Sequence, residues 1–203
     1  MIKMFWRLVG VMLVVTGCSQ EPAEKPSIEE GPTEKALTLV NASAVDAELL
    51  ETIRQFMEKE LHVMVRTVEK PELATQKDSQ TLEAAALRAK HENDAVYILV
   101  AKLDGEEHLT VNADSGIAII NAKALYTADA KKFALRIERM AMRAAAFSFG
   151  LEPTPDPFCV TRDYRSLQDL DRMGRNYSPP WQGRYAKEVE KRGVEPAKPV
   201  EAP

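Results

Sequence analysis

Apolar residues recur along the middle of the chain with two different periods, and these periods predict both helices and strands. Between residues 45 and 61 they recur every three or four positions, which is the pattern of an amphipathic helix. Similar stripes predict a helix at about 81–90 and a longer one at about 128–149. Gly150 is expected to end the longer helix, because glycine accepts the left-handed backbone common after a helix.

Five short runs of β-branched or apolar residues predict strands, at residues 37–42, 63–68, 95–100, 109–112 and 116–122. The third run is apolar throughout, as a central strand covered on both faces would be. The fourth alternates apolar and polar residues, as an edge strand does. The element order is βαβαββα, followed by a loop-rich segment. We therefore expect a single α/β domain with a mixed sheet flanked by helices.

The first seventeen residues have the character of a secretory signal, with a short basic start, an apolar run and small residues before Cys18. Residues 15–18, Val-Thr-Gly-Cys, resemble the lipobox of bacterial lipoproteins. That resemblance implies cleavage before Cys18, a diacylglycerol on its sulfur and a lipid anchor in the membrane of the bacterial cell envelope. The alternative is an ordinary secretory signal that ends at a cysteine by chance. Ser19, in place of aspartate, implies the periplasmic face of an outer membrane if the cell has one.

Composition divides the chain after the signal at 1–17 into three parts. Residues 18–35 are rich in Pro, Glu, Lys and Ser, so they are expected to form a flexible tether. Residues 36–186 are expected to form the folded domain, and residues 187–203, of the same polar character, a disordered tail.

The charge of the mature chain disfavours nucleic acid as a partner. Loss of the signal removes two cations, which leaves 25 Lys and Arg against 31 Asp and Glu and changes the net charge from −4 to −6. Binding of nucleic acid depends on neutralising phosphates with Lys and Arg, so an acidic protein is poorly suited to it.

The segment from Arg143 to Tyr185 resembles the catalytic end of the archaemetzincins, a family of zinc-dependent metallopeptidase-like proteins. Their pattern is HExxHxxGxxH, followed directly by C-x4-C-x-M and later by a C-x-x-C pair. Here Gly150, Pro155, Pro157 and Cys159 fall at the family's spacing without a gap. The resemblance implies a metzincin-like fold in which two histidines on the last long helix and a third from the next loop bind zinc.

The glycine fixes the register, and at that register the zinc ligands of the family are replaced. Its first histidine falls on Arg143, its glutamate on Ala144, its second histidine on Phe147 and its third on Pro153. None of these side chains can donate a lone pair to zinc or act as a general base. We therefore expect no catalytic residue, no metal and no cofactor, and a protein that is not an enzyme. The alternative is a zinc-dependent metallopeptidase that uses other ligands.

A second zinc site of the family is also incomplete in this chain. Its first cysteine falls on Thr154, Cys159 is retained, and no cysteine occurs around 178–182, where the last pair belongs. We expect Cys159 to be a small buried residue, with a lone reactive thiol as the alternative.

Arg143 has two possible roles. It is expected to reach solvent or to pair with Glu152 or another acid, as helix arginines usually do. The alternative is that Arg143 and Phe147 fill the cleft that holds zinc in the family.

The fourth predicted strand is a candidate peptide-binding edge. The resemblance implies that metzincin-like folds hold substrate as an added strand beside the active-site helix, and here that edge comprises Leu109, Thr110, Val111, Asn112 and Ala113. The favoured function is thus a membrane-anchored pseudo-peptidase that binds a peptide or protein in the envelope. A structural envelope lipoprotein with an ordinary edge, guarded by Glu106, Glu107 and Asp114, is the remaining alternative.

Overall fold

The computed structural model describes residues 33–197 of the chain. The predicted signal peptide at 1–17, the lipidation at Cys18 and nearly all of the tether lie outside the described residues, so these remain predictions. None of the helices formed by residues 33–197 is both long and apolar enough to cross a membrane.

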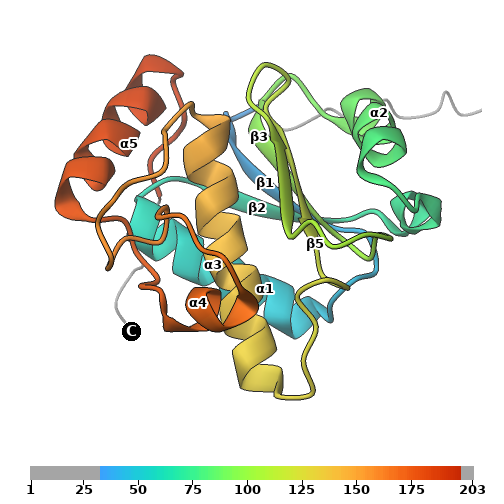
Figure 1. Ribbon diagram of the computed structural model, residues 1–203. Coiled ribbons are helices and arrows are strands. Elements are labelled where there is room, and N and C mark those ends of the chain that lie inside the picture. Colours follow the sequence, from blue (N-terminus) through green and yellow to red (C-terminus); the bar gives the residue numbers. More distant parts are fainter. Residues whose placement is uncertain (1–32, 198–203) are drawn as a thin grey trace, which may run out of the picture. The chain divides into compact units, whose positions relative to one another are not determined.

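The centre of the fold is a five-stranded sheet in the order β2-β1-β3-β5-β4 (Figure 1). The strands are β1 (Ala36–Asn41), β2 (Val65–Glu69), β3 (Asp94–Ala101), β4 (Leu109–Asn112) and β5 (Ile117–Asn121). All neighbours are parallel except β4, which runs antiparallel to β5 at the edge. The prediction of a mixed sheet is confirmed, with β3 at its centre and β4 at its edge.

Helices cover both faces of this sheet. They are α1 (Ala47–Leu61), α2 (Ser79–Ala89), α3 (Ala130–Ser148), α4 (Leu167–Arg172) and α5 (Pro179–Lys191), with a short 3₁₀ turn, η1, at Pro71–Thr75. Figure 1 shows α2 on one side of the sheet and α1 and α3 on the other. The three predicted helices correspond to α1, α2 and α3.

The core forms two layers because β3 is buried on both faces. Val96, Ile98 and Val100 face α1 and α3, while Tyr97 and Leu99 face α2. Side chains alternate along a strand, so an uninterrupted apolar run supplies both layers at once.

Aspartates start helices α1, α2 and α3. Asp46, Asp78 and Asp129 each accept a hydrogen bond from the backbone N–H three residues later, at 2.7, 2.8 and 2.9 Å. A carboxylate at this position satisfies an otherwise unpaired donor and interacts favourably with the positive end of the helix dipole.

The C-terminal part is more ordered than its composition suggests, so the prediction of a disordered tail from residue 187 is wrong as far as residue 197. Helix α5 continues to Lys191, and Val194 is buried against the α1 and α3 layer. Beyond it the chain pairs with the start of the domain, where Glu195 N–H donates to the Lys35 carbonyl at 2.8 Å and Val63 bridges to Pro196. These bonds and the apolar contacts outweigh the polar composition of the segment.

Candidate functional site

Helix α3 carries the functional positions predicted from sequence, and its charged residues are unusually buried. Four of them are nearly inaccessible, namely Arg136, Glu138, Arg139 and Arg143. Each of the four reaches the segment between residues 159 and 175. The helix therefore holds the C-terminal part of the domain through polar as well as apolar contacts.

Two of these residues are neutralised by opposite charges. Arg136 donates to both oxygens of Asp171, through Nε at 2.7 Å and Nη2 at 2.8 Å. Arg175 donates through Nη2 to Glu138 Oε2 at 2.6 Å. Such two-pronged pairing satisfies a guanidinium and a carboxylate together, so these pairs act as structural cross-links.

Arg143, where the family has its first zinc-binding histidine, has no such partner. Its side chain is 6 % exposed, and Nη1 donates to the carbonyl oxygens of Val160 at 2.8 Å and Arg162 at 2.6 Å. Nε is buried without a hydrogen-bond partner, and Nη2 donates to no described residue. Burial lowers the pKa of the Arg143 guanidinium from its ordinary value. The expectation that Arg143 reaches solvent or pairs with Glu152 or another acid is therefore wrong, because backbone carbonyls hold it inside the domain.

Two aromatic rings flank this guanidinium. Its central carbon lies 4.9 Å from the centroid of the Phe147 ring and 5.1 Å from that of Tyr164. A cation over an aromatic face is stabilised by the electron-rich ring, and more so when water is excluded. Arg143 and Phe147 thus pack together, as the cleft-filling alternative expects, and Tyr164 completes the arrangement.

A cavity of about 330 Å³ remains open beside Arg143. It is bounded by residues of α3, of β4 and of the loop before α4: Glu107, His108, Leu109, Val111, Arg143, Phe147 and Tyr164. The structure therefore brings together two features that the sequence presents separately: Arg143 on α3, which the resemblance aligns with a zinc-binding histidine, and the predicted peptide-binding edge.

Tyr164 and His108 are members of this site that the sequence analysis missed. His108 Nδ1 lies 2.8 Å from the Tyr164 hydroxyl, and the two rings stack with centroids 5.7 Å apart. Burial, with a smaller contribution from the Arg136 charge, lowers the pKa of His108, and burial raises that of Tyr164. Both side chains are therefore largely neutral at pH 7. An aromatic residue among the polar residues 161–166 was the available signal for Tyr164.

The β4 edge presents backbone groups in an alternating pattern. Asn121 N–H donates to the His108 carbonyl at 3.1 Å, which makes this a hydrogen-bonded pair of the antiparallel ladder. Because such pairs recur every second residue, Thr110 also bonds to β5, whereas Leu109 and Val111 direct their N–H and C=O groups away from the sheet. Leu109 and Val111 are also the β4 residues that line the cavity.

Ala113, predicted as part of this strand, lies in a turn instead. The strand ends at Asn112 because its side-chain oxygen accepts hydrogen bonds from the backbone N–H groups of Asp114 and Ser115, each at 3.1 Å. This local bonding competes with strand pairing, as is common for asparagine.

The second replaced site is a small hydrogen-bonded cluster. Cys159 is a free, fully buried cysteine whose sulfur lies 3.1 Å from the Thr161 hydroxyl and accepts the Ser178 N–H at 3.3 Å. Thr154 is also buried. The thiol is thus held in the core by neighbouring polar groups, which does not favour the reactive-thiol alternative.

The residues at both sites do not fit the zinc ions of the family. At the first site Ala144 buries a methyl group in the core and the neighbouring Arg143 is a cation, so neither a ligand nor a favourable field for Zn²⁺ is provided. Pro153, in the place of the third histidine, has no donor atom in its side chain. Within residues 33–197, no group of three or more His, Cys, Asp or Glu side chains is arranged to hold a metal ion.

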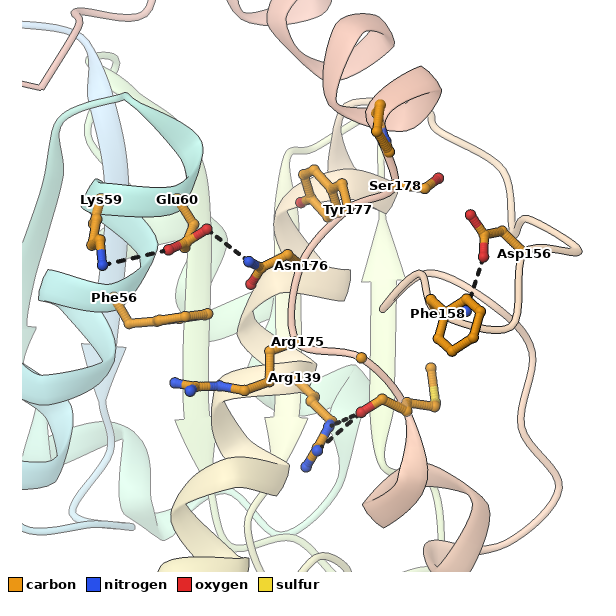
Figure 2. A pocket seen from close by; sticks show the side chains of 13 residues that line it. Phe56, Lys59, Glu60, Arg139, Asp156, Phe158, Arg175, Asn176, Tyr177 and Ser178 are labelled. Carbon is orange, nitrogen blue, oxygen red and sulfur yellow. Dashed lines mark hydrogen bonds and ion pairs between the residues drawn. The ribbon is translucent and has the colours of Figure 1, made fainter.

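A larger hollow of about 840 Å³ lies between α1 and the segment before α5 (Figure 2). Its polar groups are bonded to one another: Asn176 Nδ2 donates to Glu60 at 2.8 Å, and Asp156 accepts the backbone N–H of Phe158 at 2.9 Å. Arg139, at its base, donates to the carbonyl of Met173 through two nitrogens. The hollow therefore offers no unpaired buried donor comparable to that of Arg143.

Comparison with known structures shows an archaemetzincin-like fold. An archaemetzincin from Methanopyrus kandleri superposes with a TM-score of 0.62 at 15 % identity, covering 80 % of this chain and 99 % of the other. A zinc-dependent peptidase from Methanocorpusculum labreanum gives 0.59 at 16 % identity, with coverage of 73 % and 99 %. An archaemetzincin from Archaeoglobus fulgidus, in complex with malonate, gives 0.55 at 17 % identity, with coverage of 75 % and 99 %.

In comparisons of sequence, no model of a protein family and no curated protein matches the chain. The likeness thus establishes a metallopeptidase-like fold, as the resemblance in the sequence implied.

Proposed function

We propose that this protein is a membrane-anchored pseudo-peptidase, which binds an extended peptide along β4 without cleaving it. The observation that carries the proposal is the juxtaposition of the Arg143 cavity and the outer edge of β4, with which no strand within residues 33–197 pairs, in a metallopeptidase-like fold. The edge supplies backbone bonding, and the cavity supplies a place for side chains.

Loss of hydrolysis is argued from the residues at the catalytic positions. Hydrolysis by a zinc peptidase needs a metal-bound water and a base. The base position is Ala144, whose methyl group is in the core, and the first ligand position is a cation held by two carbonyls. The guanidinium of Arg143 would repel a divalent cation. The substitutions at these two positions therefore oppose both binding of the metal and activation of water.

Peptide binding is argued from the chemistry of the free edge. A strand added beside β4 would exchange hydrogen bonds with the outward N–H and C=O groups of Leu109 and Val111. All four residues of β4 are partly exposed, so the edge is accessible to a ligand. Alternate residues of the added strand would face the cavity, which confers selectivity for their side chains.

A matched pair of proline variants tests the proposal. Val111→Pro removes an outward N–H while leaving the β4–β5 ladder intact, since that group does not bond to β5. Thr67→Pro is the control, because Thr67 is exposed on β2, the edge strand at the opposite side of the sheet. The probe is a fluorescent mixture of hexapeptides with randomised sequence, measured by anisotropy.

We expect Val111→Pro to weaken binding about tenfold or more through the lost bonds and steric block, and Thr67→Pro to leave it unchanged. Protection of residues 109–112 from hydrogen exchange by the peptides should disappear in the first variant alone. If no peptide binds the unmodified protein, the structural alternative is favoured instead.

Hydrolysis and anchoring each have a direct measurement. Purified protein incubated with zinc and casein is expected to show neither turnover nor a shifted melting temperature; stoichiometric zinc with cleavage would support the enzyme alternative. In a bacterial host, the full chain is expected to incorporate labelled palmitate, and Cys18→Ser to abolish incorporation. Wild-type protein that incorporates no palmitate would overturn the proposal of a lipid anchor.

A further inference from the structure

We infer that the cavity beside β4 is a carboxylate site, in which the guanidinium of Arg143 binds the free C-terminal carboxylate of an extended peptide. The inference rests on the proposed function and adds to it the chemical feature that the site recognises. The partner is thereby narrowed to proteins or peptides that present their C-terminus.

The first support is the unused edge of the guanidinium. Nη1 of Arg143 donates hydrogen bonds to two carbonyl oxygens, and these bonds fix the plane of the guanidinium. Nε and Nη2 have no described partners. These two nitrogens form the side of arginine that receives a carboxylate in a two-pronged arrangement. Nε has no accessible surface in the unliganded protein, so a carboxylate meets Nη2 first and pairs with Nε only if neighbouring side chains move. Arg136, on the same helix, binds Asp171 through the same two atoms, at 2.7 and 2.8 Å.

The second support is the electrostatic imbalance at the site. Arg143 is 6 % exposed, and its described hydrogen-bond acceptors are the carbonyl oxygens of Val160 and Arg162. The charge of Asp163 offsets part of the burial but forms no ion pair with Arg143. A buried charge and an unpaired buried donor are both unfavourable unless a ligand compensates for them. An anion entering the cavity would supply the missing charge and the missing acceptors at once.

The other groups of the cavity agree with a small, singly charged anion. His108 is largely neutral at pH 7 because burial lowers its pKa, so it adds no second cation. Glu107, on the rim, accepts a hydrogen bond from Thr110 at 3.2 Å and opposes entry of highly charged anions. One guanidinium in contact with the rings of Phe147 and Tyr164 suits a planar carboxylate better than a phosphate dianion.

The position of the cavity selects a chain terminus. Leu109 and Val111, whose backbone groups point outward from β4, also line the cavity that Arg143 lines. A peptide added along this edge therefore passes beside the cavity of about 330 Å³. A terminal carboxylate is attached to the last residue's backbone, so a peptide that ends beside the cavity can turn this group toward Arg143.

The test compares hexapeptide mixtures that differ only at the C-terminus. One mixture carries a free carboxylate and the other a C-terminal amide, and affinities for the full-length wild-type protein are measured by anisotropy at pH 7. We expect the amide mixture to bind about tenfold more weakly or worse, because the two-pronged charged bond is lost. This comparison needs no variant, so it does not depend on how Arg143 substitutions fold.

Two variants test whether the preference for a free carboxylate depends on Arg143. Arg143→Met should bind both mixtures with the same, weaker affinity, while Arg165→Met, which changes an exposed arginine of the neighbouring loop, should keep the wild-type preference. Melting temperatures of both variants verify that they are folded.

The outcomes separate this inference from the proposed function. Equal binding of acid and amide mixtures overturns the carboxylate site while peptide binding stands. Absence of binding by either mixture overturns the proposed function. A third mixture, amidated but ending in aspartate or glutamate, tests the source of the carboxylate: binding as tight as the free acids would overturn the assignment to a terminus.

Discussion

Arg136 and Arg143 are two turns apart on α3, and both are buried, yet their hydrogen-bond partners differ in charge. Arg136 meets the carboxylate of Asp171 with one edge and the Leu125 carbonyl with Nη1, at 3.0 Å, so all of its nitrogens have acceptors. Arg143 has acceptors for Nη1 alone. A buried cation that forms an ion pair with its own chain is a structural cross-link, whereas Arg143, which forms none, is the group that we propose a ligand would meet.

The pKa directions of the two side chains follow from this difference. The hydrogen bonds from Asp171 raise the pKa of Arg136, and burial lowers the pKa of Arg143. In the first case the surroundings favour the charged form, and in the second they disfavour it. The region of α3 around Arg136 is therefore expected to contribute to stability, and the region around Arg143 to binding.

Removing the neutralised arginine should have the largest effect. Arg136→Met leaves Asp171 without its partner in a mostly buried position, so the free energy of unfolding should fall by about 3 kcal/mol. Chemical denaturation measures it. The double variant Arg136→Met/Asp171→Leu is the control, and it should recover most of the loss because no unpaired charge remains. A loss that persists unchanged in the double variant would contradict the cross-link.

Protonation of Asp171 at low pH should weaken the same ion pair, with a smaller loss in the free energy of unfolding than the Arg136→Met substitution causes. The hydrogen bond from Arg136 lowers the pKa of Asp171 below its ordinary value of 3.8. The pair therefore stabilises the fold fully above about pH 4, and this contribution is lost as the pH falls through the lowered value. Wild-type unfolding free energy should fall more steeply below pH 4 than that of Asp171→Asn, whose side chain does not titrate. Parallel curves for the two proteins would argue against the pairing.

Arg143→Met should lower the free energy of unfolding much less than Arg136→Met does. The substitution leaves no unpaired carboxylate and relieves the burial of a charge, against the loss of two hydrogen bonds to carbonyls, so we expect a change of about 1 kcal/mol or less. Denaturation of both single variants under the same conditions gives the ratio. Equal losses would mean that Arg143 is as much a structural element as Arg136.

The smallest effect concerns His108, on the cavity wall. Its folded-state pKa lies below the ordinary 6.5, so the unfolded chain binds more protons as the pH falls below that value. Stability should consequently rise with pH toward 6.5 and be lost below it, and His108→Asn should weaken this dependence. Melting temperatures between pH 5 and 7.5 would show it, with His62→Asn as the control, because His62 is an exposed residue at the end of α1.

The layers of the fold were predictable because each depends on a local pattern. The apolar run of β3, the alternation of β4 and the stripe of α3 ending at Gly150 are all visible within a few residues of sequence. Helix α5 was not predicted, because it begins with two prolines and has few apolar positions. Its order depends on Tyr185 and Val194 packing against distant elements, which composition does not show.

The site was predictable in its positions but not in its interactions. The register set by Gly150 identified Arg143 and Phe147, and alternation identified β4. The burial of Arg143 depends on carbonyl oxygens seventeen and nineteen residues later, and His108 meets Tyr164 across 56 residues. Such contacts are set by tertiary packing, so a helix arginine and a loop tyrosine carry little local signal of them.

The closure between Lys35 and Glu195 also has a consequence for engineering. Because the two limits of the described domain are hydrogen-bonded neighbours, a few added residues could join position 197 to position 33. New termini could then open at the exposed turn around Gly105, just before β4. A circular permutant of this kind would place a fused reporter next to the Arg143 cavity, so that ligand entry could be followed by a change in fluorescence.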